Sequence, residues 1–517
     1  MSQPASASVT PSIAPKTTRT RRQLRGSSLL LLGQVFSKGA NFATQILIVR
    51  YLSQSDYGAF AYALSIVALA SSITTFGLDR AVTRFVPIYH EKEDYDRLFG
   101  TLLMVVGVTL SLGVSIVLLF YGLQSSTLGS YVGDDFARTL LLILIFLAPV
   151  QAMDDLMIGM FAVFSSSRSI FFRKHILTPG LKLLVVVALM WSGSTVFFLA
   201  GGYVLVGAIG VSFYIALLIH LMRKQALFQH FRRAPLIFPW REVLTFTVPL
   251  LTSDLVYAVM NSMDAIILEH FHTAVDVAAL RAVQPTAKLN QVVLASFGIL
   301  FTPAAARMFA RNDRVGINNL YWQNAVWTAV GSFPIFVLTF SVARSFTLLL
   351  YGERYESSAI ILALLSFAYY FNAALGQNGL TLKVFGHVRY IVVINVLAVI
   401  ANLAINLVLI PLYGALGAAI GTTATLVLHN ILKQAGLRFG TGINLFDPTY
   451  FRVYLIITVC AIGLLVVQWW LNAPIYIDIL LAGVASLLVV WLNRRALNVA
   501  ETFPEMLRIP VLGRLLR

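Results

Sequence analysis

Apolar runs long enough to cross a membrane recur along nearly the whole chain, and they constrain its fold more than any other feature. A helix of about 20 apolar residues spans the hydrocarbon core of a bilayer. Hydrophobic residues make up 58% of the 517 residues, and charged residues make up only 12%. That charged fraction is about half of what a soluble domain carries. The sequence therefore predicts an all-α integral membrane protein and excludes a soluble globular one.

We expect about fourteen transmembrane helices. They are predicted at residues 27–49, 59–82, 99–123, 138–162, 176–197, 199–221, 243–268, 279–305, 321–344, 357–382, 390–412, 415–436, 452–471 and 475–492. Their spacing predicts two lobes of six helices each and a terminal helix pair.

The chain divides into six predicted segments. These are a disordered basic cytoplasmic tail (1–26), an N-lobe of spans 1–6 (27–221), a basic cytoplasmic linker (222–242), a C-lobe of spans 7–12 (243–436), spans 13 and 14 (437–492) and a cytoplasmic or interfacial C-terminus (493–517). Residues 1–26 are rich in Ser, Thr, Pro and Ala before they become basic, which is typical of disorder.

The distribution of basic residues predicts the orientation of the chain. Thirty of the 38 Lys and Arg residues fall in the tail, in the loops after even-numbered spans and in the C-terminus. The opposite loops hold only Arg50, Arg138, Arg344 and Arg354. Because cytoplasmic loops are enriched in Lys and Arg, we expect both termini in the cytoplasm. The net charge of +16 then reflects topology, and we expect no nucleic acid partner.

The two six-helix lobes are expected to form a parallel pseudo-repeat. A single offset of 219 residues aligns Ile46–Arg50 with Ala265–Glu269, and it also aligns Gln45 with Asp264. Six spans per lobe give both lobes the same orientation, so the predicted pseudo-axis lies along the membrane normal.

The first predicted helix carries polar residues on one face only. Gln34, Lys38, Asn41 and Gln45 fall within about 60° of one another at 100° per residue. A lysine facing lipid near mid-membrane costs on the order of 3 kcal/mol, so Lys38 is expected to face a cavity. A polar patch that joins two helices is the alternative for the three amides.

The sequence after this face resembles a known family of transporters. Residues 48–60, IVRYLSQSDYGAF, and residues 76–85, FGLDRAVTRF, are similar to two motifs of the Wzx-type polysaccharide or O-antigen flippases. That family belongs to the multidrug/oligosaccharidyl-lipid/polysaccharide exporter superfamily. The resemblance implies a bacterial inner membrane protein that moves a polyprenyl-pyrophosphate-linked oligosaccharide to the outer leaflet. Its implied partners are this lipid-linked oligosaccharide, membrane lipid, and glycan polymerase and glycosyltransferases.

The eighth predicted span is a second helix with an unusual polar face. Arg281, Gln284, Lys288 and Gln291 cover about 80° of it. Two cations on one span would cost roughly 5–7 kcal/mol against lipid, which favours a cavity. The alternative for Arg281 is an ion pair with Glu269 or Asp276. Pro285 predicts a kink in this helix.

Other membrane-embedded polar residues complete the predicted site. Span 7 carries the cavity residues Ser253, Tyr257 and Asn261, together with the acids Asp254 and Asp264. Lys182 in span 5 is expected either to join the cationic cavity or to reach the inner surface. The acids Asp154 and Asp155 in span 4 are expected either to bind a coupling ion or to pair with Arg168 or Lys182.

A row of asparagines marks span 11. Asn395, Asn402 and Asn406 share one face of that helix. Hydrogen bonds between helices are the first interpretation, and a wall that contacts sugars is the second.

Spans 1, 2, 7 and 8 are therefore expected to line one central cavity. Lys38, Lys288, Arg281 and Lys182 would bind an anion such as a pyrophosphate there, and the lobes would rock between inward-open and outward-open states. An ion-coupled multidrug or metabolite antiporter of the same superfamily is the alternative function, and a non-transporting scaffold is a third.

Motifs for soluble chemistry are missing from the sequence. It contains no Walker pattern and no His, Cys and acid cluster at metal spacing, and Cys460 is its single cysteine. We therefore expect a transporter rather than an enzyme, without catalytic residues, metal or cofactor. Coupling to an H⁺ or Na⁺ gradient through Asp264, Asp254, Asp154 or Asp155 stays open.

Overall fold

The computed structural model describes residues 16–123, 135–164, 171–224, 229, 231, 236–471 and 474–498. Within these residues, the side chains of 16–32, 162–164, 252 and 253 are not described.

The described residues form helices and no strands. In the first half these are α1 (Lys16–Tyr51), α2 (Gln54–Thr75), α3 (Leu78–Glu91), α4 (Tyr95–Gly122), α6 (Asp135–Leu144), α7 (Leu147–Phe164), the π-helix η2 (Phe171–Leu177), α9 (Thr178–Ser192) and α10 (Val196–Lys224). In the second half they are α12 (Trp240–Phe271), α13 (Ala274–Lys288), η3 (Leu289–Gln291), α14 (Val292–Ala310), α15 (Arg314–Phe340), α16 (Ala343–Tyr351), η4 (Glu353–Tyr355), α17 (Ser358–Ala374), α18 (Asn378–Val384), α19 (Val388–Thr441), η5 (Pro448–Tyr450), α20 (Phe451–Leu471), α21 (Ile475–Leu492) and α22 (Arg494–Leu497).

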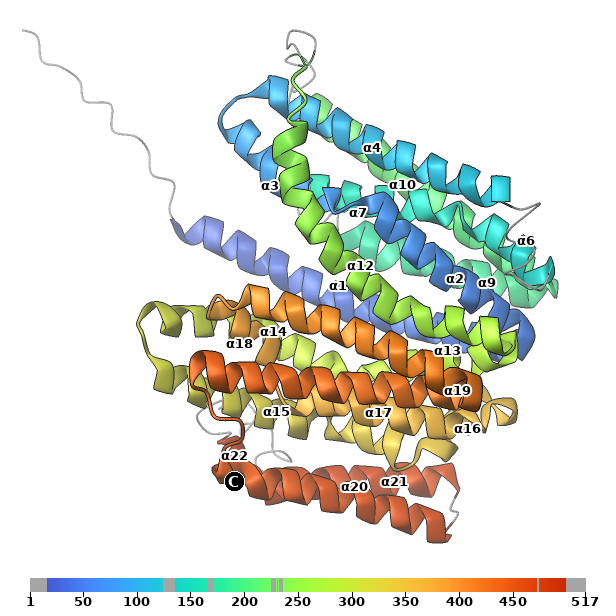
Figure 1. Cartoon of the computed structure of the whole chain (residues 1–517), viewed down its shortest axis with the longest axis vertical. Coiled ribbons are helices and arrows are strands. Elements are labelled where there is room, and N and C mark those ends of the chain that lie inside the picture. Colours follow the sequence, from blue (N-terminus) through green and yellow to red (C-terminus); the bar gives the residue numbers. More distant parts are fainter. Residues whose placement is uncertain are drawn as a thin grey trace, which may run out of the picture.

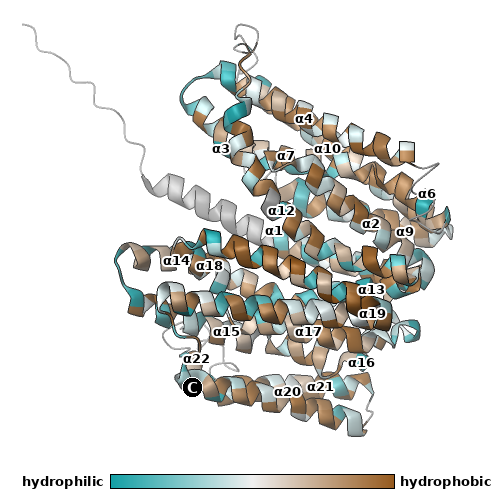
Figure 2. Ribbon diagram, viewed as in Figure 1, coloured by the Kyte–Doolittle hydropathy of each residue, from teal (hydrophilic) through white to brown (hydrophobic). Residues whose placement is uncertain are grey.

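The helices lie roughly side by side in two groups (Figure 1). One group contains α2 to α10, and the other contains α13 to α19, with α20 and α21 packed on α15 at its far edge. Helices α1 and α12 run between the groups, and α12 packs on both α2 and α19. Apolar residues cover most of the helix length, while polar residues gather at loops such as the one between α3 and α4 (Figure 2). The predicted all-α membrane fold is confirmed.

Within the described residues, eleven helices are long and apolar enough to span a membrane. A twelfth span results if α15 and α16, which bend by 75° at their junction, count as one. Helix α19 counts once although its 54 residues would extend about 80 Å and Gly414 breaks it with φ 56° and ψ −133°. Its two halves cover the predicted spans 390–412 and 415–436, and the number fourteen stays a prediction.

The first helix begins earlier than the sequence predicts. Helix α1 starts at Lys16, so residues 16–26 continue the first helix. Arg, Gln and Leu in this stretch are good helix formers and extend a helix that is already nucleated. Residues 1–15 and 499–517 lie outside the described part of the chain, so the predictions for both tails stay predictions there.

Several predicted spans are divided in the structure. Span 2 breaks between α2 and α3 at Phe76 and Gly77, both with positive φ, and span 10 breaks at Gly376, also with positive φ. Span 4 is divided into α6 and α7, and span 8 into α13, η3 and α14. Spans 2 and 8 and spans 4 and 10 are six apart, which is the interval of the predicted repeat, whereas span 9 is divided between α15 and α16 and span 3 is continuous in α4. The repeat and its lobe boundaries stay predictions.

The apolar cores are distributed unequally along the helices. One core, which we call the joint core, includes Ile48 and Phe60 from the first group and Val277 and Tyr351 from the second. It lies at the end of the molecule that carries Arg50 and Arg354, the predicted outer end. At the opposite end, two separate cores serve the two groups. Burial therefore holds the groups together at the predicted outer end and leaves them separate at the predicted inner end.

Direct contacts reinforce the closure of the predicted outer end. Arg50 donates from Nε to the carbonyl of Leu350 at 2.8 Å, and Gln54 donates to the carbonyl of Arg354 at 2.6 Å. Helices α2 and α13 approach so closely at Gly58 that a Cβ there would overlap the carbonyl of Ala274. Only glycine permits this approach.

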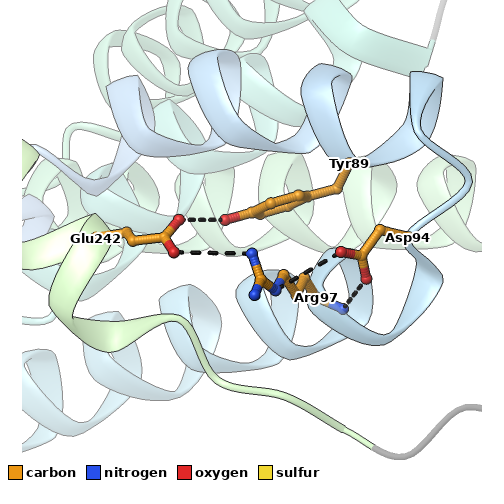
Figure 3. Close-up of polar contacts among 4 residues, drawn as sticks. All are labelled: Tyr89, Asp94, Arg97 and Glu242. Atoms are coloured by element: carbon orange, nitrogen blue, oxygen red, sulfur yellow. Dashed lines mark hydrogen bonds and ion pairs between the residues drawn. The ribbon is translucent and has the colours of Figure 1, made fainter.

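At the predicted inner end, α12 binds the first helix group through its first turn. Glu242 accepts a hydrogen bond from the Tyr89 hydroxyl at 3.0 Å and lies 3.8 Å from the Arg97 guanidinium (Figure 3). Arg97 also lies 3.6 Å from Asp94. Helix α12 therefore crosses from one group to the other along its length.

Candidate functional site

Two adjoining cavities lie where α12 and α13 meet the other helices. The first, which we call the cationic chamber, has a volume of about 440 Å³ and is lined from α1, α2, α9, α10, α12 and α13. Its polar lining consists of Asn41, Thr44, Gln45, Tyr57, Ser65, Lys182, Tyr203, Asn261, Ser262, Arg281, Gln284 and Lys288. Among the described residues, no Asp or Glu lines it. Three cations without a lining carboxylate make this chamber suitable for an anion.

Arg281 is held in the cationic chamber by neutral oxygens. Its guanidinium donates to Gln284 Oε1 at 2.8 Å, to Ser65 Oγ at 2.9 Å and to the carbonyl of Asn261 at 2.8 Å. No ion pair links it to another described residue. The alternative pairing with Glu269 or Asp276 is therefore wrong, because α13 turns Arg281 toward α2 and α12. Three oxygen acceptors hold the guanidinium in place.

Pro285 explains how α13 is tied to the first helix group. A proline has no N–H, so the carbonyl four residues earlier, that of Arg281, loses its helical donor. The Gln45 amide and the Tyr57 hydroxyl each donate to this carbonyl at 3.3 Å. The predicted break in the helix follows at η3, immediately after Lys288.

Lys288 and Lys182 supply the other two charges. Lys288 ends α13 and donates from Nζ to Oδ1 of Asn261 at 3.0 Å. The negative end of the α13 dipole favours a cation at this position. Lys182 Nζ lies 5.0 Å from the centre of the Tyr203 ring, a cation–π distance, so it lies in the chamber instead of reaching the inner surface.

The second cavity, which we call the carboxamide chamber, has a volume of about 550 Å³. Asn261, Gln284 and Lys288 line both chambers, so the two adjoin there. Its other polar lining residues are Arg80, Asp254, Tyr257, Gln291, Tyr369, Asn372, Asn395, Asn402, Thr422, Thr425, His429 and Lys433. Most of them come from α17 and from the two halves of α19.

Several predicted site residues lie elsewhere. Asn41 and Gln45 line the cationic chamber, whereas Gln34 and Lys38 are exposed and line neither chamber. Lys38 lies seven residues, or about 10 Å, from Gln45 toward the predicted inner end, beyond the chamber. Neither chamber includes Lys38, and its predicted position in the cavity stays a prediction. The side chain of Ser253 lies outside the described part of the structure.

The acid Asp264 is buried among neutral polar groups. It is 1% exposed and accepts hydrogen bonds from the Asn406 amide at 2.7 Å and the Thr422 hydroxyl at 2.8 Å. It forms no ion pair with any described residue. By contrast, Asp254 lines the carboxamide chamber and pairs with Arg80 at 2.5 Å.

The two acids of span 4, Asp154 and Asp155, have different surroundings. Asp154 pairs with Arg173, whose Nη1 lies 2.7 Å from Oδ2 and whose guanidinium covers the Tyr214 ring at 4.2 Å. The predicted partners were Arg168, which lies outside the described residues, and Lys182. Asp155 is exposed and lines neither chamber. The ion pair favours a structural role for Asp154.

Two cations that line the carboxamide chamber were used in the sequence analysis only to predict the orientation of the chain. Arg80 and Lys433 belong to the positive-inside count, yet both line the carboxamide chamber. Arg80 follows the break at Gly77, and Lys433 lies one helical turn from His429 on α19. Lys433 follows the chamber residue His429 by four residues in the sequence. This spacing puts the two side chains on the same helix face, so it could have indicated the cavity position of Lys433.

A scan against protein-family models matches residues 23–309 to "Polysaccharide biosynthesis protein". The match covers more than half of the chain. The chain belongs to this family. The resemblance predicted from its first helical hairpin is confirmed. No curated protein matches the chain in a direct search.

Solved structures of transporters share the fold of this polysaccharide biosynthesis family member. The lipid II flippase MurJ, in an inward closed conformation, superposes with a TM-score of 0.69 at 14% identity, covering 91% of this chain and 99% of that chain. A MATE multidrug transporter of the MOP superfamily, in an inward-facing conformation, gives 0.61 at 15% identity over 78% and 94%. A Vibrio cholerae MATE transporter gives 0.54 at 16% identity over 83% and 98%.

The chain shares the fold of transporters of this superfamily. Its family is named for polysaccharide biosynthesis, and its structural neighbours are flippases and multidrug transporters rather than enzymes. The prediction of a transporter is confirmed.

Proposed function

We propose that the protein moves a polyprenyl-pyrophosphate-linked oligosaccharide from the cytoplasmic to the outer leaflet of a bacterial inner membrane. The observation that carries this proposal is the cationic chamber, in which Arg281, Lys288 and Lys182 converge with no described carboxylate in the lining. A pyrophosphate supplies the negative charge that these cations lack. The polyprenyl tail stays in lipid while the headgroup enters the chamber.

The unequal ends of the molecule support a mechanism of alternating access. The joint core and the Arg50 contacts close the predicted outer end, whereas the cores at the predicted inner end are separate. This arrangement supports an inward-facing state that admits the headgroup from the cytoplasmic side. Rocking of the two helix groups then exposes the same chamber outward.

We further propose that an H⁺ or Na⁺ gradient acts through Asp264. A carboxylate buried with only an amide and a hydroxyl as partners is costly to keep charged, so a proton or a cation bound there is favoured. Asp254 and Asp154 are weaker candidates because Arg80 and Arg173 already neutralise them.

The alternative, an ion-coupled multidrug antiporter, fits the chamber less well. A cationic drug would meet three cations and no described carboxylate in the cationic chamber. The single Asp254 of the adjoining chamber is occupied by Arg80. Like charges would repel such a drug.

The test is flipping by the purified full-length protein in liposomes. The probe is a fluorescent polyprenyl-pyrophosphate-linked oligosaccharide, and its transfer between leaflets is followed with a membrane-impermeant quencher. Arg281→Gln and Lys288→Gln should each slow transfer about tenfold or more, because each removes a charge-assisted bond of about 1.5–3 kcal/mol. Lys92→Gln, an exposed charge outside both chambers, should not. Equal transfer by all variants, or exchange of a cationic dye instead of the lipid, would refute the proposal.

A further inference from the structure

The carboxamide chamber has a lining chemistry unlike that of the cationic chamber. Asn372, Asn395 and Asn402 present side-chain amides, each of which both donates and accepts hydrogen bonds. Tyr257 adds an aromatic ring that is 72% exposed. Amides and an open aromatic face fit a ligand with many hydroxyl or acetamido groups and apolar ring faces, which is the chemistry of a sugar.

Folding of α19 at Gly414 creates this lining. Its two halves run antiparallel, as two bonds across the hairpin establish: His429 Nε2 lies 2.8 Å from Asn395 Oδ1, and Asn402 Nδ2 lies 3.4 Å from Thr425 Oγ1. These bonds fix the orientation of the Asn395 and Asn402 amides before a ligand arrives. A preorganised polar wall binds with less loss of conformational entropy.

One cation of this chamber has no polar partner among the described residues. Arg80 and Asp254 neutralise each other at 2.5 Å, and Lys288 donates to Asn261 at the boundary with the cationic chamber. Lys433 is half-buried and forms no hydrogen bond or ion pair with any residue that the structure describes. An ammonium on a cavity wall favours an anion there.

We propose that the carboxamide chamber holds the glycan of the substrate, and that Lys433 pairs with a carboxylate on this glycan. The proposal rests on the proposed function, in which Arg281 and Lys288 bind the pyrophosphate. It assigns a preference for an acidic over a neutral oligosaccharide. An anionic phospholipid headgroup has the same charge chemistry, so the experiment includes an arm that separates the two sources.

Binding to the full-length protein in nanodiscs tests the assignment. The two probes are polyprenyl-pyrophosphate disaccharides that end in glucuronic acid or in glucose and are otherwise identical. Wild-type protein should bind the acidic probe about tenfold more tightly, a typical effect of one charge-assisted contact. Lys433→Gln should remove this difference by weakening only the acidic probe. Lys92→Gln, which changes an exposed lysine just after the end of α3, should preserve it, and Lys288→Gln should weaken both probes by the same factor.

Each other outcome decides against the assignment. Equal weakening of both probes by Lys433→Gln would place Lys433 on the pyrophosphate, and no effect on either would make it structural. A preference that appears only in phosphatidylcholine nanodiscs and vanishes with phosphatidylglycerol would assign Lys433 to a phospholipid headgroup. Failure of wild-type protein to bind either probe would overturn the proposed function as well, whereas equal wild-type binding of both would overturn the acidic glycan alone.

Discussion

Arg354 donates a hydrogen bond from its guanidinium to the backbone carbonyl of Arg50, and Arg50 donates in return to the carbonyls of Leu349 and Leu350. The two arginines thus join the end of α1 to the turn after α16. Each acceptor is a main-chain oxygen, so the contact depends on the backbones meeting at this point. It exists only while the predicted outer end is closed.

Removing this contact should favour opening at the predicted outer end. Loss of one exposed hydrogen bond of about 1 kcal/mol shifts a two-state equilibrium roughly fivefold. In a Cys460→Ala background, Arg354→Ala should raise labelling of an Ala61→Cys thiol in the cationic chamber by an impermeant reagent on intact cells. Arg344→Ala, which removes a pair with Glu356 inside one helix group, is the control. Unchanged labelling in Arg354→Ala would show that the arginines do not stabilise closure.

The close approach at Gly58 predicts a second way to open the same end. Gly58→Ala places a methyl group against the Ala274 carbonyl, so α2 and α13 must separate. Overpacking of this kind costs about 1–3 kcal/mol. We expect a lower thermal midpoint in detergent and more outside labelling of the Ala61→Cys thiol. Gly107→Ala, where a Cβ meets nothing within 4 Å, should change neither.

Substitution of Lys288 in the cationic chamber should reduce export more than substitution of Lys38 on α1. Lys288→Ala should abolish or severely reduce glycan export while membrane insertion stays normal, because the removed charge has only an amide partner. Lys288→Arg should retain part of the activity. Lys38→Ala should have a smaller effect, since Lys38 lines neither chamber. Export is measured as surface polysaccharide at matched protein levels. Poor accumulation of Lys288→Ala would instead indicate a structural lysine.

Asp264→Asn should separate coupling from folding. An asparagine keeps an oxygen for the Asn406 amide and offers an N–H to the Thr422 hydroxyl, so yield should hold. Transport driven by an imposed H⁺ or Na⁺ gradient should fall about tenfold, and its dependence on the gradient should weaken. Thr422→Ser, which keeps the hydroxyl, is the matched control. Normal gradient-driven transport in Asp264→Asn would exclude Asp264 as the coupling residue.

Cysteine labelling on intact cells tests the predicted orientation. Glu353→Cys should react with an impermeant reagent, whereas Lys92→Cys and Arg311→Cys should react only after permeabilisation. All three positions are exposed, so a lack of reaction reports sidedness rather than burial. Arg173 is unsuitable because it is buried against Asp154. Reaction of Arg311→Cys on intact cells would reverse the orientation.

Hydropathy and helix periodicity predicted the helices and part of the site. The apolar runs identify the spans because a bilayer demands about 20 residues per crossing. Charged residues placed mid-span identified Arg281 and Lys288 because their cost in lipid requires a cavity. Those two residues do line one chamber.

Contacts between distant segments could not be predicted in the same way. Lys38 shares a helix face with Gln45, but periodicity does not tell where along that face the cavity ends. The partners of Arg281 lie on α2 and α12, and nothing local in the sequence distinguishes them from Glu269. Lys433 was counted as a cytoplasmic charge because the sequence alone does not distinguish a lysine in a loop from a lysine that lines a cavity near the end of a span.

The joint core has an energetic consequence for the direction of traffic. An outward-open state must pull apart apolar surfaces that are now buried between the helix groups, while the inward-facing state leaves each group's own core intact. Under the proposed function, an empty carrier would rest facing the predicted inner side, where its cargo would be made. Opening toward the predicted outer side without cargo would then be rare, so solutes on that side would meet a closed surface.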